Sequence, residues 1–477
     1  MSVPDTHEVR PAGQDPGDRG PLDKILNVFA ETRAGEGGSA ALLSLSVFFL
    51  LVSYYLVKTA REPLILASGA EIKSYASVGQ TLLLIPVTYL YGRLSHRVGR
   101  IKLITIVTLV FASNLVLFFG LNLLGVPIGL AFYLWAGVFN MMIVAQFWSF
   151  AADVYTEEQG KRLFAILGIG STVGAVAGSG ISALLIRPVG VYGLMVASAV
   201  FLLASLALTV IVNQRENRQI AANKVKSADK KPDEAEKPLG AEGGFKLILA
   251  DRYLLLIAVL AFTLNCVKTN GEYILDRTLL EHVKAILPHG QNAQAFSQAY
   301  IGEFKAQYFL YVNIATVVLQ LFVVSRVIKY LGVRVALFVS PVLLLCGYSG
   351  AVLFPVFSLI YAVKIAENTL DYSLGNTSRQ ALWLLSSRDE KYKAKSVIDA
   401  AIVRAGDALS AGVTFLGVTM HFVTEHFIIA NLVLILIWSI AMVLLGREHK
   451  KREAAHGKQP SEHAKDGETH AAAALSA

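Results

Sequence analysis

The stretch Val57–Leu66, VKTAREPLIL, is repeated in outline 210 positions later by Val267–Leu275, VKTNGEYIL. Each copy ends a long apolar run and places a lysine and a glutamate four residues apart. Ionisable side chains inside an apolar segment are costly in a bilayer unless they serve a cavity or a pathway. The repetition therefore indicates a duplicated membrane protein whose charged positions deserve a functional explanation.

The composition supports a polytopic membrane protein. Apolar residues make up 54% of the 477 positions and charged residues 16%, and the mean hydropathy is +0.54. A helix needs about 20 apolar residues to cross a bilayer, and twelve windows meet this requirement. The predicted spans are 41–60, 75–93, 102–123, 127–151, 163–186, 191–212, 252–274, 306–325, 334–353, 355–385, 396–420 and 426–446. We predict an all-α fold with twelve transmembrane helices.

The loop charges predict the orientation. Lysine and arginine crowd the loops after the second, eighth and tenth predicted spans, and the alternate loops are poor in both. Cytoplasmic loops carry the excess of positive charge, so both termini are expected in the cytoplasm, with the protein in an inner or plasma membrane. The net charge of +8 reflects this bias and does not indicate nucleic-acid binding. Both cysteines lie in apolar segments, and no metal or cofactor is expected.

The chain divides into two similar halves. The segments Arg93–Gly99 and Arg326–Gly332 both place an arginine six residues before a glycine, and both follow the second span of their half. A charged stretch between the halves is too polar to bury a core. The predicted parts are a cytoplasmic tail (1–40), a six-helix bundle (41–212), a cytoplasmic linker (213–250), a second six-helix bundle (251–446) and a disordered tail (447–477). Parallel six-helix repeats are typical of one large class of secondary transporters.

The loop Gly92–Lys102, GRLSHRVGRIK, resembles the conserved loop of the major facilitator superfamily, G-x-L-x-D-R-x-G-R-[KR], with His96 at the usual acidic position. The resemblance implies that cations of this loop pair with acids at helix ends and help to close one face of a transporter. The candidate gating residues are Gly92, Arg93, Arg97, Gly99 and Arg100. A plain cytoplasmic anchor loop would explain the charge but not the glycine spacing.

Charged residues inside the spans concentrate on the first, seventh and tenth helices. They are Lys58, Lys268, Glu272, Lys364, Glu367, Asp371 and Arg379. In the major facilitator fold that the chain resembles, these helices and the fourth line the central cavity; the fourth contributes Trp135 and Asn140. Lysines near the end of a span can also reach the interface without any role, and this alternative stays open for Lys58 and Lys268.

Lys364, Glu367 and Asp371 share the spacing of one helical face, as expected if that face meets water, partner charges or substrate. Two other patterns favour structural roles. Arg404 and Asp407 are expected to form a structural ion pair. The stretch GIGSTVGAVAGSG has glycines at 170, 174 and 178, a small-residue face for close helix packing. It lacks the strand before it and the lysine after it that a phosphate-binding loop requires.

Three segments resemble the ATP/ADP translocase family of plastids and intracellular bacteria. They are VKTAREPLILASGAE (57–71), FWSFAADVYTEEQGKRLFAILGIGSTVGAVAGS (147–179) and DYSLGNTSRQALWLLSSRDEKYKAKSVIDAAIVRAGDALSAG (371–412). The resemblance implies that Arg61 and Arg379 take the places of two lysines that this family needs for transport. The acids of the family's fourth and seventh helices have no match, and Lys268 stands in the latter place.

We therefore predict a secondary active transporter, not an enzyme, that acts by alternating access as an antiporter. Its cargo is a small anion, either a nucleotide of the ATP/ADP type or a related phosphorylated or organic anion, and the chain is expected to act in the bilayer as a monomer. The predicted substrate-binding residues are Lys58, Arg61, Lys268, Arg379, Asn140 and Trp135, and the charge-pairing residues are Glu62, Glu272, Glu367, Asp371 and Lys364. A proton-coupled porter and a non-transporting receptor remain as alternatives.

Overall fold

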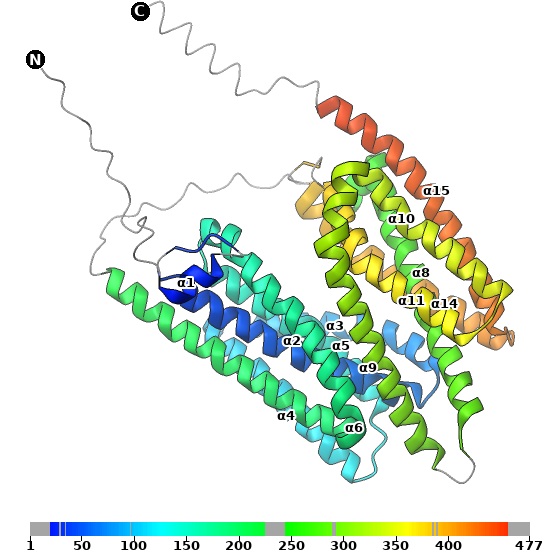
Figure 1. The fold of residues 1–477 in the computed structure, drawn as a ribbon, viewed down its shortest axis with the longest axis horizontal. Helices are drawn as coiled ribbons and strands as arrows, with labels where there is room; N and C mark the ends of the chain where they lie inside the picture. The colour runs from blue at the N-terminus through cyan, green and yellow to red at the C-terminus, as the bar shows by residue number, and fades with distance from the viewer. Residues whose placement is uncertain are drawn as a thin grey trace, which may run out of the picture. The chain divides into compact units, whose positions relative to one another are not determined.

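The computed structural model describes residues 20–27, 30–33, 35–95, 97–224, 244–288, 292–383, 386–387 and 390–456. Every regular element in these ranges is a helix (Figure 1). Contacts between residues divide the chain into two compact units. The first unit comprises Met1–Glu234 with Leu279–Ile314, and the second comprises Ala235–Thr278 with Ala315–Ala477.

The first unit is built from long helices separated by short turns. Its elements are α1 (Pro21–Leu26), α2 (Gly37–Leu66), α3 (Ala70–Ser95), α4 (Arg100–Leu123), α5 (Gly129–Val154), α6 (Glu157–Lys224) and most of α9 (Ala293–Leu319). Gly190 interrupts α6 with φ 68° and ψ −177°, a conformation that glycine adopts readily. The break separates the two spans predicted at 163–186 and 191–212.

The second unit contains several short turns of π-helix between its α-helices. Its elements are α7 (Gly244–Ala250), α8 (Arg252–Ile286, which runs past the unit boundary), η2 (Gln320–Val324), α10 (Ser325–Leu353), α11 (Phe357–Leu370), η3 (Asp371–Gly375), α12 (Asn376–Leu382), η5 (Glu390–Ala394), α13 (Lys395–Val397), η6 (Ile398–Ile402), α14 (Val403–Thr419) and α15 (Thr424–His456). Gly332, with φ 81°, breaks α10.

The twelve predicted spans all correspond to helical runs in the described ranges. Nine helices there are long and apolar enough to cross a membrane. One of them, Arg162–Arg218, contains the break at Gly190 and therefore holds two spans. The remaining two spans correspond to α3, which falls outside the nine, and to α11 and α12, which η3 joins end to end. The all-α, multi-span class predicted from the sequence is thus confirmed.

The helices at the predicted ends of the bundles are longer than expected. The last helix of the first half continues to Lys224, α7 lies inside the predicted linker, and α15 continues to His456. Residues 1–19 and 457–477 of the predicted tails, and 225–243 of the linker, lie outside the described residues.

Close packing of α2 against α6 organises the first unit. A Cβ atom added at Gly170 would lie 2.4 Å from the Ser44 carbonyl oxygen, and one at Gly174 would lie 2.6 Å from that of Phe48. Gly178 meets the backbone of α2 in the same way. Small residues at such a face let two membrane helices approach closely, so the prediction of a packing face is confirmed.

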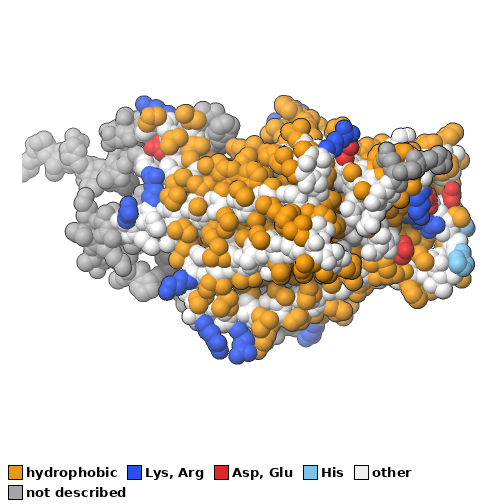
Figure 2. Space-filling view, turned by 90° about the horizontal axis from the view of Figure 1, so that it is seen from below, with side chains coloured by type: hydrophobic (Ala, Val, Ile, Leu, Met, Phe, Trp, Pro, Cys, Tyr) orange, Lys and Arg blue, Asp and Glu red, His pale blue; other side chains and the backbone are white. Residues whose placement is uncertain are grey.

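Buried hydroxyl groups join α2 to the later part of α6. Ser46 Oγ lies 3.0 Å from Ser205 Oγ, and Ser53 Oγ lies 2.7 Å from Ser198 Oγ. Such hydrogen bonds hold helices together where water is absent. The outer surface is apolar: many large hydrophobic side chains are exposed, and they cover much of the face seen in Figure 2. These exposed side chains fit contact with lipid.

The hydrogen bonds to Glu36, the residue before α2, are expected to stabilise the fold in a pH-dependent way. Glu36 accepts hydrogen bonds from Arg162 Nη1 at 3.0 Å, Gln159 Nε2 at 3.2 Å and the Arg33 backbone N–H at 3.0 Å. Burial raises the pKa of Glu36, but the hydrogen bonds, led by that of Arg162, outweigh it and hold the pKa below its usual 4.5. A group whose folded pKa is lowered stabilises the fold above its unfolded pKa and loses this effect as pH falls.

We expect Glu36→Gln to lower the free energy of unfolding at pH 7 by about 1–3 kcal/mol, because hydrogen bonds to a partly buried charge are lost. Thermal unfolding of both proteins should show this difference shrinking once the pH falls below about 4.5 and through the lower folded pKa. Glu158→Gln is the control, because the side chains of Glu158 and its partner Arg33 are 64% and 42% exposed, and exposed pairs contribute little. Equal stability of Glu36→Gln and wild type at pH 7 would contradict the assignment.

Candidate functional site

Ionisable side chains inside the first unit gather around Glu62 on α2. The Glu62 carboxylate is fully buried and accepts hydrogen bonds from Arg61 Nη2 at 2.7 Å and Lys73 Nζ at 2.6 Å. Lys305 Nζ lies 3.6 Å from the same carboxylate. A buried charge is tolerated when it is paired and hydrogen-bonded. Glu62 is thus the shared partner of three cations, from α2, α3 and α9.

Sequence reasoning identified Arg61 and Glu62 but missed Lys73 and Lys305. The span predicted at 306–325 begins one residue after Lys305, whereas α9 begins at Ala293. Lys305 is therefore inside a helix and is fully buried. The one signal in the sequence for Lys305 was its place immediately before a predicted apolar span.

The other predicted binding residues of the first unit lie against aromatic rings. Lys58 Nζ is 4.4 Å from the ring centre of Phe309 and 5.2 Å from that of Tyr55. The Arg61 guanidinium lies 4.9 Å from the ring of Tyr133. Contacts of a cation with a ring face are favourable, and more so away from water. These contacts fix the direction of both cationic side chains.

Trp135 lies in an aromatic stack between α4 and α5. Its ring is 5.2 Å from that of Phe139 and 5.5 Å from that of Phe132, nearly parallel to both. Asn140 is on the same helix, and its buried Oδ1 has no hydrogen-bond partner within the described structure. The stack gives Trp135 a packing role; substrate binding by Trp135 and Asn140 stays a prediction.

In the second unit, Asp371 holds two cations at once. Its carboxylate lies 2.8 Å from Lys268 Nζ and 2.8 Å from Arg379 Nη2. The Asp371 side chain is 10% exposed, while those of Lys268 and Arg379 are 32% and 27% exposed. The acid is therefore enclosed, and the two cations remain partly open. Residues 103 and 8 positions away from Asp371 in the sequence meet at one carboxylate.

The π-helical turn η3 explains how Arg379 reaches Asp371. In a regular α-helix each residue turns by about 100°, so residues eight apart point about 80° away from each other. A π-turn takes up one extra residue, so two side chains eight residues apart across it are oriented like side chains seven apart in a regular α-helix. The angle between them is then about 20°. Asp371 begins η3 and Arg379 follows it on α12. The irregular turn thus aligns the two side chains on one face.

The remaining charged residues of α11 form a separate buried cluster. Lys364 Nζ lies 2.5 Å from Glu367 Oε1, and the Tyr348 hydroxyl donates to Glu367 Oε2 at 2.8 Å. Lys364 also donates to the Lys268 carbonyl oxygen at 2.9 Å. A Cβ atom at Gly271 would lie 2.4 Å from the Tyr348 hydroxyl, so glycine is required for this contact with α8.

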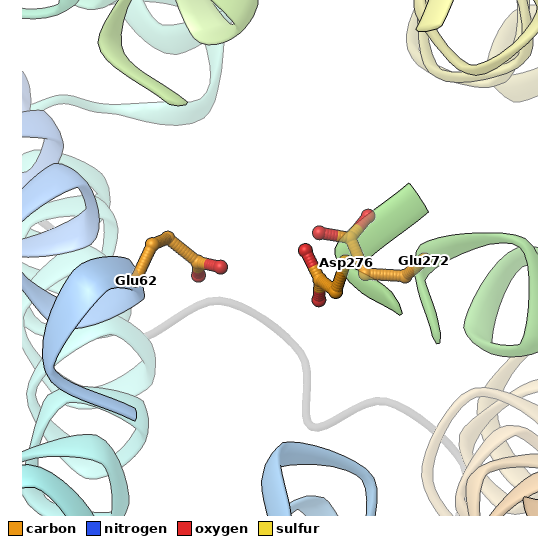
Figure 3. Close-up of side chains that lie close together, drawn as sticks. All are labelled: Glu62, Glu272 and Asp276. Atoms are coloured by element: carbon orange, nitrogen blue, oxygen red, sulfur yellow. The ribbon is translucent and has the colours of Figure 1, made fainter. Parts of the chain in front are cut away.

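Two acids project from α8 one turn apart, Glu272 and Asp276 (Figure 3). Asp276 is buried and Glu272 is partly buried. In the same figure Glu62 projects from α2. Asp276 was not singled out in the sequence, although its spacing of four residues from Glu272 places both on one helical face.

A cavity of about 330 Å³ opens beside Asp371 in the second unit. Its walls come from α8, from the segment η3–α12 and from the segment η6–α14. Lys268, Asp371 and Arg379 all line it. The volume lies at the lower end of the range for small-molecule pockets. Of the residues predicted to bind substrate, two therefore share one cavity.

In the candidate gating loop, Arg100 pairs with an acid at a helix end. Arg100 Nη1 lies 3.5 Å from Asp153 at the end of α5, and Arg100 Nη2 donates to Asn213 Oδ1 at 3.3 Å. The Arg93 guanidinium lies 5.9 Å from the ring of Tyr89. His96 is outside the described residues. The expected pairing of a loop cation with a helix-end acid is present; its role in gating stays a prediction.

The predicted pair on α14 is confirmed. Arg404 Nη1 lies 3.0 Å from Asp407 Oδ2, and Asp407 Oδ1 accepts from Asn265 and Thr269 at 2.7 Å and 2.8 Å. These contacts join α14 to α8. Neither Arg404 nor Asp407 lines the cavity beside Asp371.

Comparison with known proteins gives a family and distant relatives. The sequence profile of the Major Facilitator Superfamily matches residues 38–375. ADP,ATP carrier protein 1 of Chlamydia trachomatis serovar D is 22% identical over 369 residues, covering 69% of this chain and 66% of the relative. The protein of the same name from Chlamydia pneumoniae is 23% identical over 355 residues, covering 66% of each chain. The matches thus span slightly less than two thirds of the length of these relatives.

The fold is similar to that of solved transporters. The POT family transporter PepTSo superposes with a TM-score of 0.58 at 13% identity, covering 87% of this chain and 98% of that one. An auto-inhibited POT family peptide transporter gives a TM-score of 0.54 at 13% identity, covering 85% of this chain and 96% of that one. At such identity the similarity concerns the fold alone.

Proposed function

The chain belongs to the Major Facilitator Superfamily, and on this premise we propose that it is an antiporter of a small phosphorylated or nucleotide anion. The observation that carries the proposal is the shared carboxylate of Asp371, which holds Lys268 and Arg379 at the wall of a cavity. Arginine and lysine are the side chains that bind phosphate and carboxylate groups. The resemblance to ADP,ATP carriers supports a nucleotide as the first candidate.

The charge arrangement suggests why transport would be coupled exchange. Without substrate Asp371 pairs with both Lys268 and Arg379, and an incoming anion competes with it for these cations. Without substrate, the internal ion pairs would stabilise the carrier in one conformation, so it would have little tendency to change between its outward-facing and inward-facing states. With substrate bound, the anion takes the place of Asp371 as the partner of the cations. Alternating access would then proceed mainly with substrate bound. Glu62 has the corresponding place among Arg61, Lys73 and Lys305 in the first unit.

The proposal is tested by counterflow in proteoliposomes loaded with ADP, phosphate or a small organic anion, with labelled ATP, ADP, phosphate or organic anion outside. We expect uptake that requires internal anion. Arg379→Ala and Arg61→Ala should each lower the exchange rate at limiting substrate by about 10- to 100-fold, because each removes a charged hydrogen-bond donor.

Arg404→Ala is the matched control, because Arg404 also pairs with an aspartate but lies outside the cavity wall. Its exchange rate should stay near that of wild type. Rapid uptake into vesicles without internal anion would argue against exchange. Uptake driven by an imposed pH gradient would instead favour the proton-coupled porter, and absence of flux and of anion binding would favour a receptor.

A further inference from the structure

A second acid lines the cavity that contains Lys268 and Arg379. Asp399 lies in η6, and its side chain lines the same cavity as Asp371 of η3 and Arg379 of α12. Asp399 is exposed there, and it forms no ion pair within 4.0 Å among the residues that the structure describes. Asp371 in the same cavity binds two cations. Asp371 is therefore held between two cations, whereas Asp399 is open to the cavity.

Hydrogen bonds to neighbouring groups fix which atoms of the nearby amide side chains can still bind a ligand. Asn265 Nδ2 donates to the Val403 carbonyl oxygen and to Asp407 Oδ1, both at 2.7 Å. Both of its N–H groups are thus occupied, and its carbonyl oxygen remains as an acceptor. Gln380 Oε1 accepts from Lys395 Nζ at 2.8 Å. Asn265 and Asp399 both line the cavity and both offer acceptor atoms.

The cavity therefore has a cationic part and an acceptor part. A simple anion such as phosphate gains from Lys268 and Arg379 but is repelled by a carboxylate in the same small space. An anion that also carries N–H or O–H groups outside its charged group can satisfy both parts, because those donors bind the acceptors. Cargo that fills the cavity displaces water from the exposed Asp399. An acceptor that then lacks a donor costs free energy, so the acceptor part discriminates against anions without such donors. Trp383 adds an aromatic wall to the same cavity.

We propose that Asp399 is a specificity-determining residue, which selects anions that bear hydrogen-bond donors outside the charged group. Nucleotides and sugar phosphates carry such donors, whereas inorganic phosphate, pyrophosphate and simple alkyl phosphates have none outside their phosphate groups. The assignment rests on the proposed function, since it presumes that the anionic end of the cargo binds at Lys268 and Arg379.

The test compares two matched pairs of anions, ADP with pyrophosphate and glycerol 3-phosphate with methyl phosphate. Binding of each to the purified full-length protein is measured by thermal shift, and counterflow by competition. In wild type the donor-bearing member of at least one pair should bind more tightly. In Asp399→Asn its preference over its partner should fall about tenfold or more, because a hydrogen bond to a charged acceptor is lost.

Glu425→Gln, in the first turn of α15 and outside the cavity wall, is the control and should keep the wild-type preference. Asp399→Ser is made in parallel, and the elution profile of each variant checks its folding. Equal changes for both members of a pair, an unchanged preference, or failure of both Asp399 variants to fold would overturn the assignment. If wild type binds none of the four anions, the proposed function itself fails; binding with an unchanged preference in Asp399→Asn overturns only this inference.

Discussion

Replacing Glu62 by glutamine is expected to lower the free energy of unfolding by about 3–5 kcal/mol, the usual effect of removing one partner from a buried ion pair. The carboxylate is fully buried and is shared by Arg61, Lys73 and Lys305. Glutamine keeps the size of the side chain and one acceptor oxygen but removes the negative charge. The three cations would then lose the carboxylate that they have in common. Thermal or denaturant unfolding in detergent measures the effect.

Removing one of the three cations should partly restore the stability that Glu62→Gln loses. In Glu62→Gln/Lys305→Met the buried positive charge decreases with the negative one, so the double variant should be more stable than the sum of the single effects by about 1–3 kcal/mol. Glu303→Gln is the control on the same helix, because its partner Arg187 is 74% exposed and such a pair contributes about 0–1 kcal/mol. Additive effects of Glu62 and Lys305 would contradict a direct interaction.

Replacing Asp371 by asparagine is expected to tighten anion binding while it slows exchange. Asp371 pairs with both Lys268 and Arg379, so replacing its carboxylate by an amide takes away the charged competitor of the substrate. Breaking contacts of this kind changes binding by about 1.5–3 kcal/mol, or roughly 10- to 100-fold. Tighter binding slows release, and the maximal exchange rate should fall. Binding constants and counterflow rates, measured on the same preparation, separate the two effects.

The stability of this variant provides a second measurement. Without anion, Asp371→Asn should unfold at a lower temperature than wild type, and anion should raise its midpoint more than it raises that of wild type, since binding to the native state alone stabilises it. Asp251→Asn also breaks a pair with an arginine, Arg452, in the same unit, and neither residue lines the cavity. It should lower stability without changing the response to anion. An equal response in all three proteins would show that Asp371 does not compete with substrate.

Much of the architecture could be predicted from patterns along the chain. Apolar runs of the length of a bilayer predict helices, because every backbone group must be hydrogen-bonded within the hydrocarbon layer. The glycines at 170, 174 and 178 predicted a packing face, and a Cβ atom at any of them would collide with α2. The spacing of Arg404 and Asp407 predicted an ion pair, which forms at 3.0 Å. Each of these features depends on neighbours in sequence or on one helical face.

Features that depend on distant residues or on irregular helices were not predicted. Lys305 reaches Glu62 across 243 positions, and its place just outside a predicted span hid it. Asp371 and Arg379 are eight residues apart, a spacing that does not share a face in a regular α-helix; the π-turn η3 brings them together. Such a turn leaves no reliable mark in the pattern of apolar residues.

The repeated element that begins with Val57 and Val267 shows where sequence and tertiary structure divide. The sequence alone determined that the chain is an all-helical protein with many spans and predicted a duplication with charges at equivalent places, because hydrophobic length and the cost of a buried charge are local properties. Only the tertiary structure decided the partners of those charges. Glu62 is bound by cations from three helices, whereas Lys268 is bound by Asp371 at the wall of a cavity. Partner choice depends on helix packing and on a local irregularity, which similar stretches of sequence do not share.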